Sequence, residues 1–416
     1  MKKISLLIGT LMLSGCASFG EGVAKAFLEK QEEEDLRECK IFGKKFGGME
    51  ASFERSQHVV KVLMVHGVGS HIPGYSLQFQ EKLAEELDLT KVSGRYKEIM
   101  LTHKEFPEQN LGTLRVKRLL SADESREILF YELTWSPITD PDKEKLKYDT
   151  SGAYSFRRAE VNQMLKVFSN DTSPDPMIYL GGAREEILAS FRTGFCWMAG
   201  RDWSELPDYT NEQCTLDAMS VQHSINDEYA IVSHSLGSRI VMDGMQSIAQ
   251  RVGKATDGKP TAIEQGFITS FQQKHIPFYL MSNQLPLLEM GQRPPEVVNQ
   301  QDDYCVLGGS KYNERLVASI AIIAFSDPND LLSYAIPQEF AQHDLDSRLC
   351  AKITNININV AHVIDMFGMG KFANPLTAHT GYDSDDRVVA LIAEGIGSKN
   401  TAEIVKERCD WVEYVD

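Results

Sequence analysis

The chain has few positive charges for its number of negative ones. Its 416 residues include 43 Lys and Arg against 59 Asp and Glu, which gives a formal net charge of −16. Because such a charge would repel phosphates, we expect no nucleic-acid partner. The composition is otherwise ordinary for a globular protein, with 42% hydrophobic and 25% charged residues. A chain of this length can form one large α/β domain or two small ones.

The sequence also lacks the marks of a cofactor site. No two of its 7 cysteines are spaced as CxxC in the sequence, so a zinc site is not expected. We find no other cluster of metal ligands and no glycine-rich nucleotide-binding loop, and we therefore predict no metal and no cofactor. The cysteines after Cys16 are even in number, which allows disulfides in an exported protein, but the sequence does not choose among the possible pairings.

The amino terminus has no hydrophobic run long enough for a folded membrane anchor. A basic start at 1–3 precedes the short apolar stretch Ile4 to Leu13. Leu13-Ser14-Gly15-Cys16 follows, and this tetrapeptide resembles the lipobox of bacterial lipoproteins. The resemblance implies that residues 1–15 are a signal peptide, cleaved before Cys16, and that Cys16 is acylated. The alternative is an ordinary signal peptide with a chance cysteine.

An acylated cysteine would hold the protein on a membrane surface, since each buried methylene contributes about 0.8 kcal/mol. Ala17 stands where aspartate is the usual signal for retention in the inner membrane. The resemblance therefore implies the bacterial cell envelope, and the outer membrane if the source is Gram-negative. Residues 16–57 are rich in charge and glycine, so we predict a lipidated tether that precedes one folded domain over 58–416.

A central stretch has the pattern of a nucleophilic serine. The apolar run 229–232 leads into Ser233-His234-Ser235-Leu236-Gly237, and residues of helical spacing follow. A serine on a tight strand-to-helix turn is the geometry of a nucleophile elbow. The flanking residues must be small because strand and helix nearly touch. Ser233 departs mildly from the usual glycine, and an ordinary strand–turn–helix is the alternative.

An apolar, β-branched run at 59–65 predicts a buried strand, and His66-Gly67-Val68-Gly69 follows it at once. Glycines in such a loop let backbone N–H groups approach a substrate carbonyl. Strands alternating with helices along the chain predict a mainly parallel sheet covered on both faces. The expected strands lie at 59–65, 128–135, 229–232, 275–282, 316–325 and 354–360, and the last is expected near the sheet edge. The segment at about 140–226 has no strong strand, so we expect a helical cap or lid insertion there.

A serine nucleophile needs a base, and the base needs a carboxylate to orient it. Two acids compete after the strand that ends at Phe325: Asp330 precedes an apolar pair, whereas Asp327 suits the first position of a turn. Among the histidines that follow, His379 stands in a loop between the last strand and the last helix, and His362 is the alternative. We expect Asp330 and His379 to fill these two roles.

Together the motifs HGVG, SHSLGS, SDPNDLL and AHTGY resemble the α/β-hydrolase superfamily of serine esterases and lipases. The resemblance covers roughly residues 58–400. It implies the α/β-hydrolase fold, with Ser235, Asp330 and His379 as the catalytic triad. It also implies that the backbone amides of Val68 and Leu236 form the oxyanion hole.

The predicted function is a membrane-anchored serine hydrolase that cleaves a small-molecule or lipid ester through an acyl-enzyme. A serine amidase or peptidase with the same triad is an alternative. So is a non-catalytic lipoprotein that keeps the fold as a binding module. The sequence leaves the substrate's acyl and alcohol groups and the oligomeric state open.

Overall fold

The computed structural model of the chain describes residues 37–56, 59–92, 94–151, 158–256, 260–365, 371–397 and 400–412. The expected signal peptide at 1–15 and the expected lipidation site Cys16 lie outside the described residues. The strands are β1 Cys39–Phe42, β2 Val60–Val65, β3 Lys91–Val92, β4 Lys97–Thr102, β5 Asn110–Leu120, β6 Glu127–Thr134, β7 Tyr209–Thr210, β8 Glu228–His234, β9 His275–Met281, β10 Ser319–Ser326, β11 Ala351–Ile358, β12 Val363–Asp365, β13 Lys371–Ala373 and β14 Asp410–Val412.

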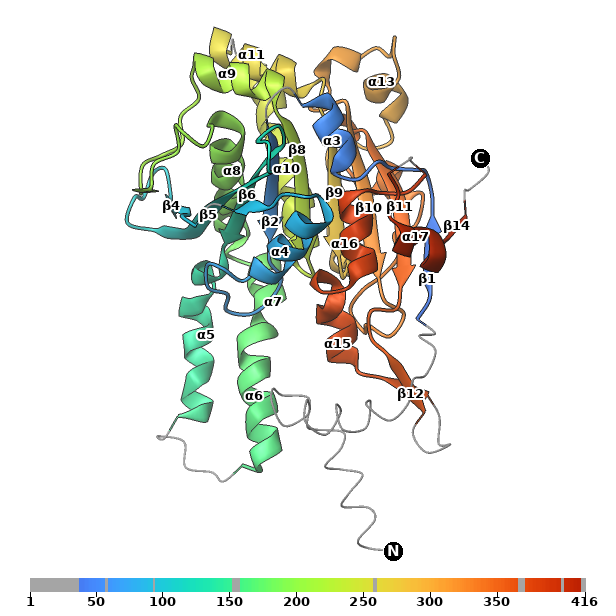
Figure 1. Cartoon of the computed structure of the whole chain (residues 1–416). Coiled ribbons are helices and arrows are strands. Elements are labelled where there is room, and N and C mark those ends of the chain that lie inside the picture. The colour runs from blue at the N-terminus through green and yellow to red at the C-terminus, as the bar shows by residue number, and fades with distance from the viewer. Residues whose placement is uncertain are drawn as a thin grey trace, which may run out of the picture.

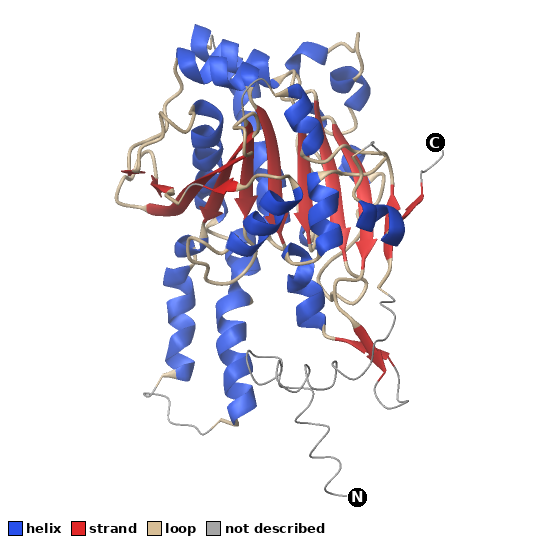
Figure 2. Ribbon diagram, viewed as in Figure 1, coloured by secondary structure: helices blue, strands red, loops and turns tan. Residues whose placement is uncertain are grey.

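The α-helices mostly alternate with these strands along the chain and lie outside the sheet (Figures 1 and 2). They are α3 Glu50–Arg55, α4 Leu77–Glu86, α5 Asp140–Lys147, α6 Glu160–Thr172, α7 Pro174–Leu180, α8 Arg184–Gly200, α9 Ala218–Asn226, α10 Gly237–Thr256, α11 Ala262–Phe271, α12 Leu285–Glu289, α13 Gln301–Cys305, α14 Phe340–His343, α15 Pro375–Thr380, α16 Asp386–Ala393 and α17 Glu403–Arg408. No helix in the described ranges is long and apolar enough to cross a bilayer.

One mixed sheet of 12 strands organises the molecule, in the order β14-β1-β11-β10-β9-β8-β2-β6-β5-β4-β7, with β3 paired to β5. The block from β11 to β6 is parallel throughout. β5 and β4 continue it as antiparallel strands, and β1 pairs antiparallel with β11 on the other side. The expected α/β class with a mainly parallel sheet is therefore confirmed.

The strands of the parallel block are buried on both faces. All six residues of β2 are buried, as its unbroken apolar run predicts. Leu63 and Val65 belong to a core that includes residues of α8 and α10, whereas Val62 and Met64 belong to a second core with residues of α4 and α16. Helices thus cover both faces of the sheet, α8 and α10 on one and α4 and α16 on the other (Figure 1).

The segment at about 140–226 contains two groups of helices. α8 packs on the sheet and against α10, and its apolar residues belong to the core. α5 and α6 instead project side by side beyond the carboxyl ends of the parallel strands (Figure 1). No residue of α6 is buried. The pair α5 and α6 is therefore the part of this segment that stands away from the sheet.

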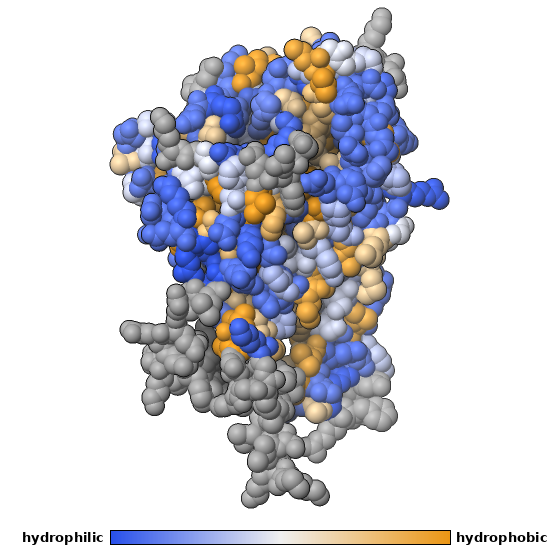
Figure 3. Space-filling model, turned by 90° about the vertical axis from the view of Figure 1, so that its right-hand side faces the viewer, coloured by the Kyte–Doolittle hydropathy of each residue, from blue (hydrophilic) through white to orange (hydrophobic). Residues whose placement is uncertain are grey.

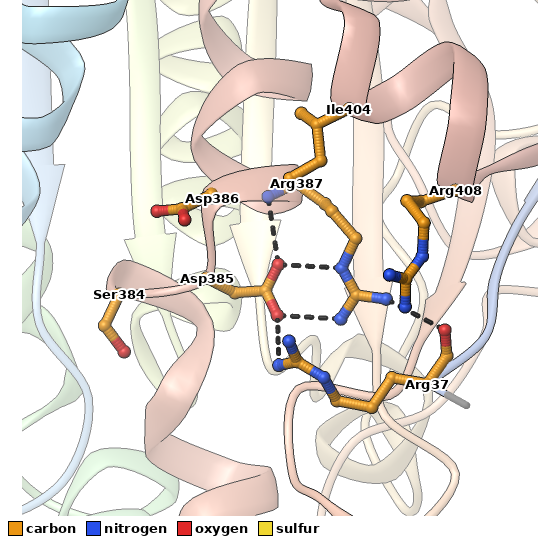
Figure 4. Close-up of a pocket in the computed structure, with 7 residues that line it drawn as sticks. All are labelled: Arg37, Ser384, Asp385, Asp386, Arg387, Ile404 and Arg408. Atoms are coloured by element: carbon orange, nitrogen blue, oxygen red, sulfur yellow. Dashed lines mark hydrogen bonds and ion pairs between the residues drawn. The ribbon is translucent and has the colours of Figure 1, made fainter. Parts of the chain in front are cut away.

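The tether predicted over residues 16–57 extends too far along the chain, because β1 within it already belongs to the sheet. β1 lies in the sheet between β11 and β14, and a disulfide joins Cys39 to Cys409, 370 positions away. Charge and glycine content pointed to a linker, but strand pairing with distant residues overrides such local signals. Arg37, the first described residue, bonds to Asp385 at the start of α16, and Asp385 also binds Arg387 (Figure 4).

The other two disulfides are local. Cys196 in α8 is joined to Cys214, and Cys305 in α13 is joined to Cys350 just before β11. All six cysteines of the described residues are paired in this way. The sequence left this pairing open.

Candidate active site

Ser235 occupies the tight turn between β8 and α10, as the sequence predicts. Its φ is 55°, a left-handed conformation that non-glycine residues rarely adopt and that often marks a functional site. A Cβ on Gly237 would lie 2.5 Å from the backbone oxygen of Val65, so this position requires glycine. Ser233 is fully buried, and its larger side chain is accommodated on the strand side of the turn.

Two side chains converge on the serine at the carboxyl end of the sheet: Asp330 from the loop after β10, and His379, which lies in the short helix α15 rather than in the expected loop. Oγ of Ser235 lies 3.1 Å from Nε2 of His379, at a sequence separation of 144. Nδ1 of the same imidazole lies 3.0 and 3.1 Å from the two carboxylate oxygens of Asp330. One imidazole therefore bridges hydroxyl and carboxylate, the arrangement in which histidine can take a proton from serine while the acid holds its tautomer.

The competing acid, Asp327, has a different set of partners. Its Oδ2 accepts hydrogen bonds from the amides of Val360 and Ala361 at 2.8 and 3.1 Å, and its Oδ1 accepts one from Asn329 at 2.8 Å. These bonds tie the loop after β10 to the segment after β11. The structure brings Asp330, and not Asp327, to His379. The competing histidine, His362, is exposed.

Ser282 is a polar neighbour that the sequence reasoning missed. It follows β9, and its hydroxyl donates to Oδ2 of Asp330 at 2.7 Å and lies 3.0 Å from Nδ1 of His379. Its position at the carboxyl end of the expected strand 275–282 was the available signal, because the carboxyl ends of parallel strands meet at one edge.

The pKa of Asp330 is lowered. Burial alone would raise it, but the hydrogen bond and charge of His379, the amide of Leu332 and the hydroxyl of Ser282 outweigh burial. The carboxylate is therefore ionised at neutral pH, as an acid that orients a histidine must be.

The His66–Gly69 loop passes directly against the serine. A Cβ on Gly67 would lie 2.7 Å from Cβ of Ser235. His66 is buried, burial lowers its pKa well below the usual range, and the neutral ring accepts a hydrogen bond from the Trp135 amide at Nε2. Its Nδ1 therefore carries the proton and donates to the Gly67 oxygen at 2.8 Å. His66 braces the loop.

The two amides expected to form an oxyanion hole flank this contact. Val68 follows Gly67 in the loop, and Leu236 follows Ser235 directly before α10. Neither amide donates to another backbone group in the part of the chain that the structure describes. Two backbone N–H groups without a backbone acceptor among the described residues, one next to Gly67 and one next to Ser235, are the kind of donors that form an oxyanion hole.

His234 supports the histidine from the strand side. Its Nε2 lies 2.7 Å from the backbone oxygen of His379. Burial, and then the charge of His379, lower its pKa to about 3, so the ring is neutral and Nε2 donates. This bond fixes the backbone that carries the His379 side chain.

Among the described residues, one group has side chains close enough to hold a metal ion: Asp202, His223 and Asp227. It lies at the amino end of the sheet, away from Ser235. Nζ of the fully buried Lys61 is 2.7 Å from Oδ2 of Asp227 and already supplies a positive charge there. Burial raises the pKa of Asp227, and Lys61 opposes that shift. These contacts describe a buried ion-pair network.

Comparisons with protein-family models, with curated proteins and with solved structures found no match to this chain. What is proposed about its function therefore depends on its own residues and their geometry.

Proposed function

We propose that this protein is a serine hydrolase of the α/β-hydrolase fold that cleaves carboxylic esters. The observation that carries the proposal is the hydrogen-bonded series Ser235, His379 and Asp330, with Oγ to Nε2 at 3.1 Å and Nδ1 to carboxylate at 3.0 Å. The parallel sheet, the turn at Ser235 and the two free amides support the same conclusion.

In the proposed reaction, Oγ of Ser235 attacks the ester carbonyl while Nε2 of His379 takes the hydroxyl proton. The carbonyl oxygen becomes an oxyanion that accepts hydrogen bonds from the Val68 and Leu236 amides. The tetrahedral intermediate collapses, the C–O bond to the leaving group breaks, and His379 gives its proton to the departing alcohol. Water, activated by the same imidazole, then attacks the acyl-enzyme and releases the acid.

The surface around the site favours an ester with an apolar acyl group. Leu331, which follows the acid Asp330 directly, is 73% exposed. Other exposed apolar side chains belong to elements at the same end of the sheet: Met164, Leu165, Val167 and Phe168 of α6, and Val363, Ile364, Phe372 and Leu376 of β12, β13 and α15. Figure 3 shows apolar surface on the lower part of the molecule, the end where Figure 1 has α15 and β12.

A surface of this kind beside the site suits a substrate in a lipid phase. It agrees with the proposed acylation of Cys16, which would keep the enzyme at a membrane of the bacterial cell envelope. Arg37, where the tether enters the domain, is held at the start of α16, directly after α15. We therefore propose a lipid or other amphiphilic ester as the substrate class.

A hydrolysis panel on the full-length protein in detergent tests the proposal. The substrates are p-nitrophenyl esters of increasing chain length and the matching p-nitroanilides, with Ser235→Ala and His379→Ala beside the unmutated protein. We expect ester hydrolysis that rises with chain length and falls by about 10⁴-fold or more in both variants. Faster anilide than ester turnover would indicate an amidase. Turnover that is absent, or unchanged in Ser235→Ala, would contradict the proposal.

A further inference from the structure

The projecting helices are bonded to the loop that carries one of the two free amides. The amide of Gly69 donates to Oδ2 of Asp175, at the start of α7, at 2.6 Å. The amide and hydroxyl of Ser70 donate to the carboxylate of Asp171, at the end of α6, at 3.0 and 2.6 Å. Two successive residues of the loop are thus held by carboxylates from the segment at 140–180.

The bond to Asp175 is deeply buried. Asp175 has no exposed surface, and its Oδ1 lies 2.9 Å from Nζ of Lys143 in α5, which is itself buried. A buried aspartate that lacked this lysine would leave an uncompensated charge, which is strongly destabilising. The lysine and the aspartate therefore form one unit that joins α5, α7 and the loop.

The ion pair of Asp175 and Lys143 lies where it can affect the reaction, because the His66–Gly69 loop that it holds is packed against Ser235. Gly67 is against Ser235, and Val68 is the single residue between Gly67 and the Gly69 amide that Asp175 holds. Gly69 has φ of 96°, a conformation open to glycine alone at little cost. Nearby, the ring of His71 lies with Nε2 3.2 Å from the Val68 oxygen. These two bonds hold the Val68–Gly69 peptide at its N–H and at its oxygen. The preceding peptide, which presents the Val68 amide, is bonded through its Gly67 oxygen to His66, so Val68 is fixed from both of its flanking peptides.

We infer that Asp175, charged against Lys143, is a positioning residue for the oxyanion hole. By accepting the hydrogen bond of Gly69, it sets the direction of the neighbouring Val68 amide toward the oxygen of the tetrahedral intermediate. The projecting helices are then part of the framework for the reaction, in addition to bearing apolar surface. The inference rests on the proposed serine hydrolase function and adds a residue to it.

The test replaces the unit as a pair, so that no buried charge is left alone. In Lys143→Met/Asp175→Leu, the ion pair and the acceptor for Gly69 are both removed. The matched control is Lys145→Met/Asp142→Leu, which removes an exposed ion pair on the same helix, α5. Asp175→Asn is the conservative variant, since its amide oxygen can still accept from Gly69 and Lys143 keeps the carboxylate of Asp171 at 3.6 Å. Each protein is assayed on one p-nitrophenyl ester, with sites counted by fluorophosphonate labelling taken to completion.

For the buried pair we expect kcat per site to fall by about 10- to 100-fold, because a small misplacement of a catalytic donor has an effect of this size. KM should change by less than about twofold, since ground-state binding is not involved. Affinity for a trifluoromethyl ketone, whose adduct has the tetrahedral oxyanion, should fall in parallel with kcat. The pH at which kcat is half-maximal should stay the same, and Asp175→Asn should lose less than the pair variant.

The outcomes separate this inference from the proposed function. If the unmutated protein neither turns over the ester nor is labelled, the serine hydrolase proposal fails. If it does both, and the pair variant keeps kcat and ketone affinity within about twofold of the control, Asp175 is not a positioning residue. A rise in KM at constant kcat would also overturn the inference.

Discussion

Gly67 lies so close to Ser235 that a Cβ added to the glycine would be 2.7 Å from the serine Cβ and 3.2 Å from its Oγ. Real Cβ atoms do not approach a neighbour this closely, because non-bonded carbon atoms repel one another well inside their preferred separation of about 3.5–4.0 Å. The loop and the turn must therefore move apart if any side chain is placed at position 67.

Gly67→Ala should thus reduce ester hydrolysis by about 100-fold or more, because the loss of one hydrogen-bond donor from an oxyanion hole lowers kcat by about that factor. The measurement is kcat on a p-nitrophenyl ester. Gly94→Ala serves as the control, because nothing lies within 4 Å of a Cβ at that glycine. A Gly67→Ala protein with unchanged kcat would show that the loop takes no part in the reaction.

Asp330→Asn and Asp327→Asn should have different effects. An amide at 330 cannot hold the His379 tautomer that accepts the serine proton, so kcat should fall by about 10³- to 10⁴-fold with the fold intact. Asp327 instead accepts amides from Val360 and Ala361, and its replacement should lower the free energy of unfolding by about 1–3 kcal/mol. Turnover per folded molecule and urea unfolding, measured on both variants, make the comparison. The reverse pattern would assign the acid to Asp327.

The stability of the protein should fall as the pH is lowered below about 6.5, the ordinary pKa of histidine. Burial lowers the pKa of His234 to about 3 in the folded protein. Between these two values the unfolded chain binds a proton that the folded chain does not, so the free energy of unfolding rises with pH across this window. One such group contributes a slope of up to about 1.4 kcal/mol per pH unit.

His234→Gln, whose amide can still donate a hydrogen bond, should remove that part of the slope. Urea unfolding at a series of pH values from 3 to 7 measures it for both proteins, within the window named above. Equal slopes would mean that His234 does not titrate in this range on unfolding.

The exposed apolar face of α6 should matter most for substrates held in a lipid phase. Leu165→Ser/Phe168→Ser removes two of its half-exposed side chains. We expect hydrolysis of a long-chain ester in phospholipid vesicles to fall by about 10- to 100-fold, and a smaller loss for a soluble short-chain ester, because burying the exposed half of two such side chains contributes about 1.5–3 kcal/mol together.

Leu307→Ser is the matched control, since Leu307 is 83% exposed and follows α13, at the opposite end of the molecule from α6 (Figure 1). Equal losses in the two variants, or no selective loss on vesicles, would count against a lipid-phase substrate.

The parallel block of the fold could be predicted because its strands are unbroken apolar runs bounded by turns. The run at 59–65 became β2, and that at 275–282 became β9. β5 could not be recognised in this way, because one face of an antiparallel strand is less buried and its pattern is mixed. β1 is four residues long and pairs with residues far along the chain, so no local sequence pattern predicts it.

The candidate site shows the same division. At the turn of Ser235 and in the glycine loop, the backbone passes so close to its neighbours that positions 237 and 67 require glycine. Such glycines can be recognised in the sequence. The choice between Asp330 and Asp327 depends on which carboxylate meets His379 in space, and so does the contact of Ser282 with that pair. The bond of Asp175 to the loop joins positions 106 apart, and nothing near Asp175 in the sequence marks it.

Covalent labelling of Ser235 tests the central claim most directly. The full-length protein is treated with a fluorophosphonate, digested, and the modified residue is located by mass spectrometry, with Ser235→Ala and His379→Ala treated in parallel. We predict one adduct per molecule, on Ser235, no adduct in Ser235→Ala, and labelling slowed by about 10³-fold or more in His379→Ala, because the hydroxyl needs its base. No adduct on the unmutated protein, or an adduct that persists in Ser235→Ala, would contradict the account.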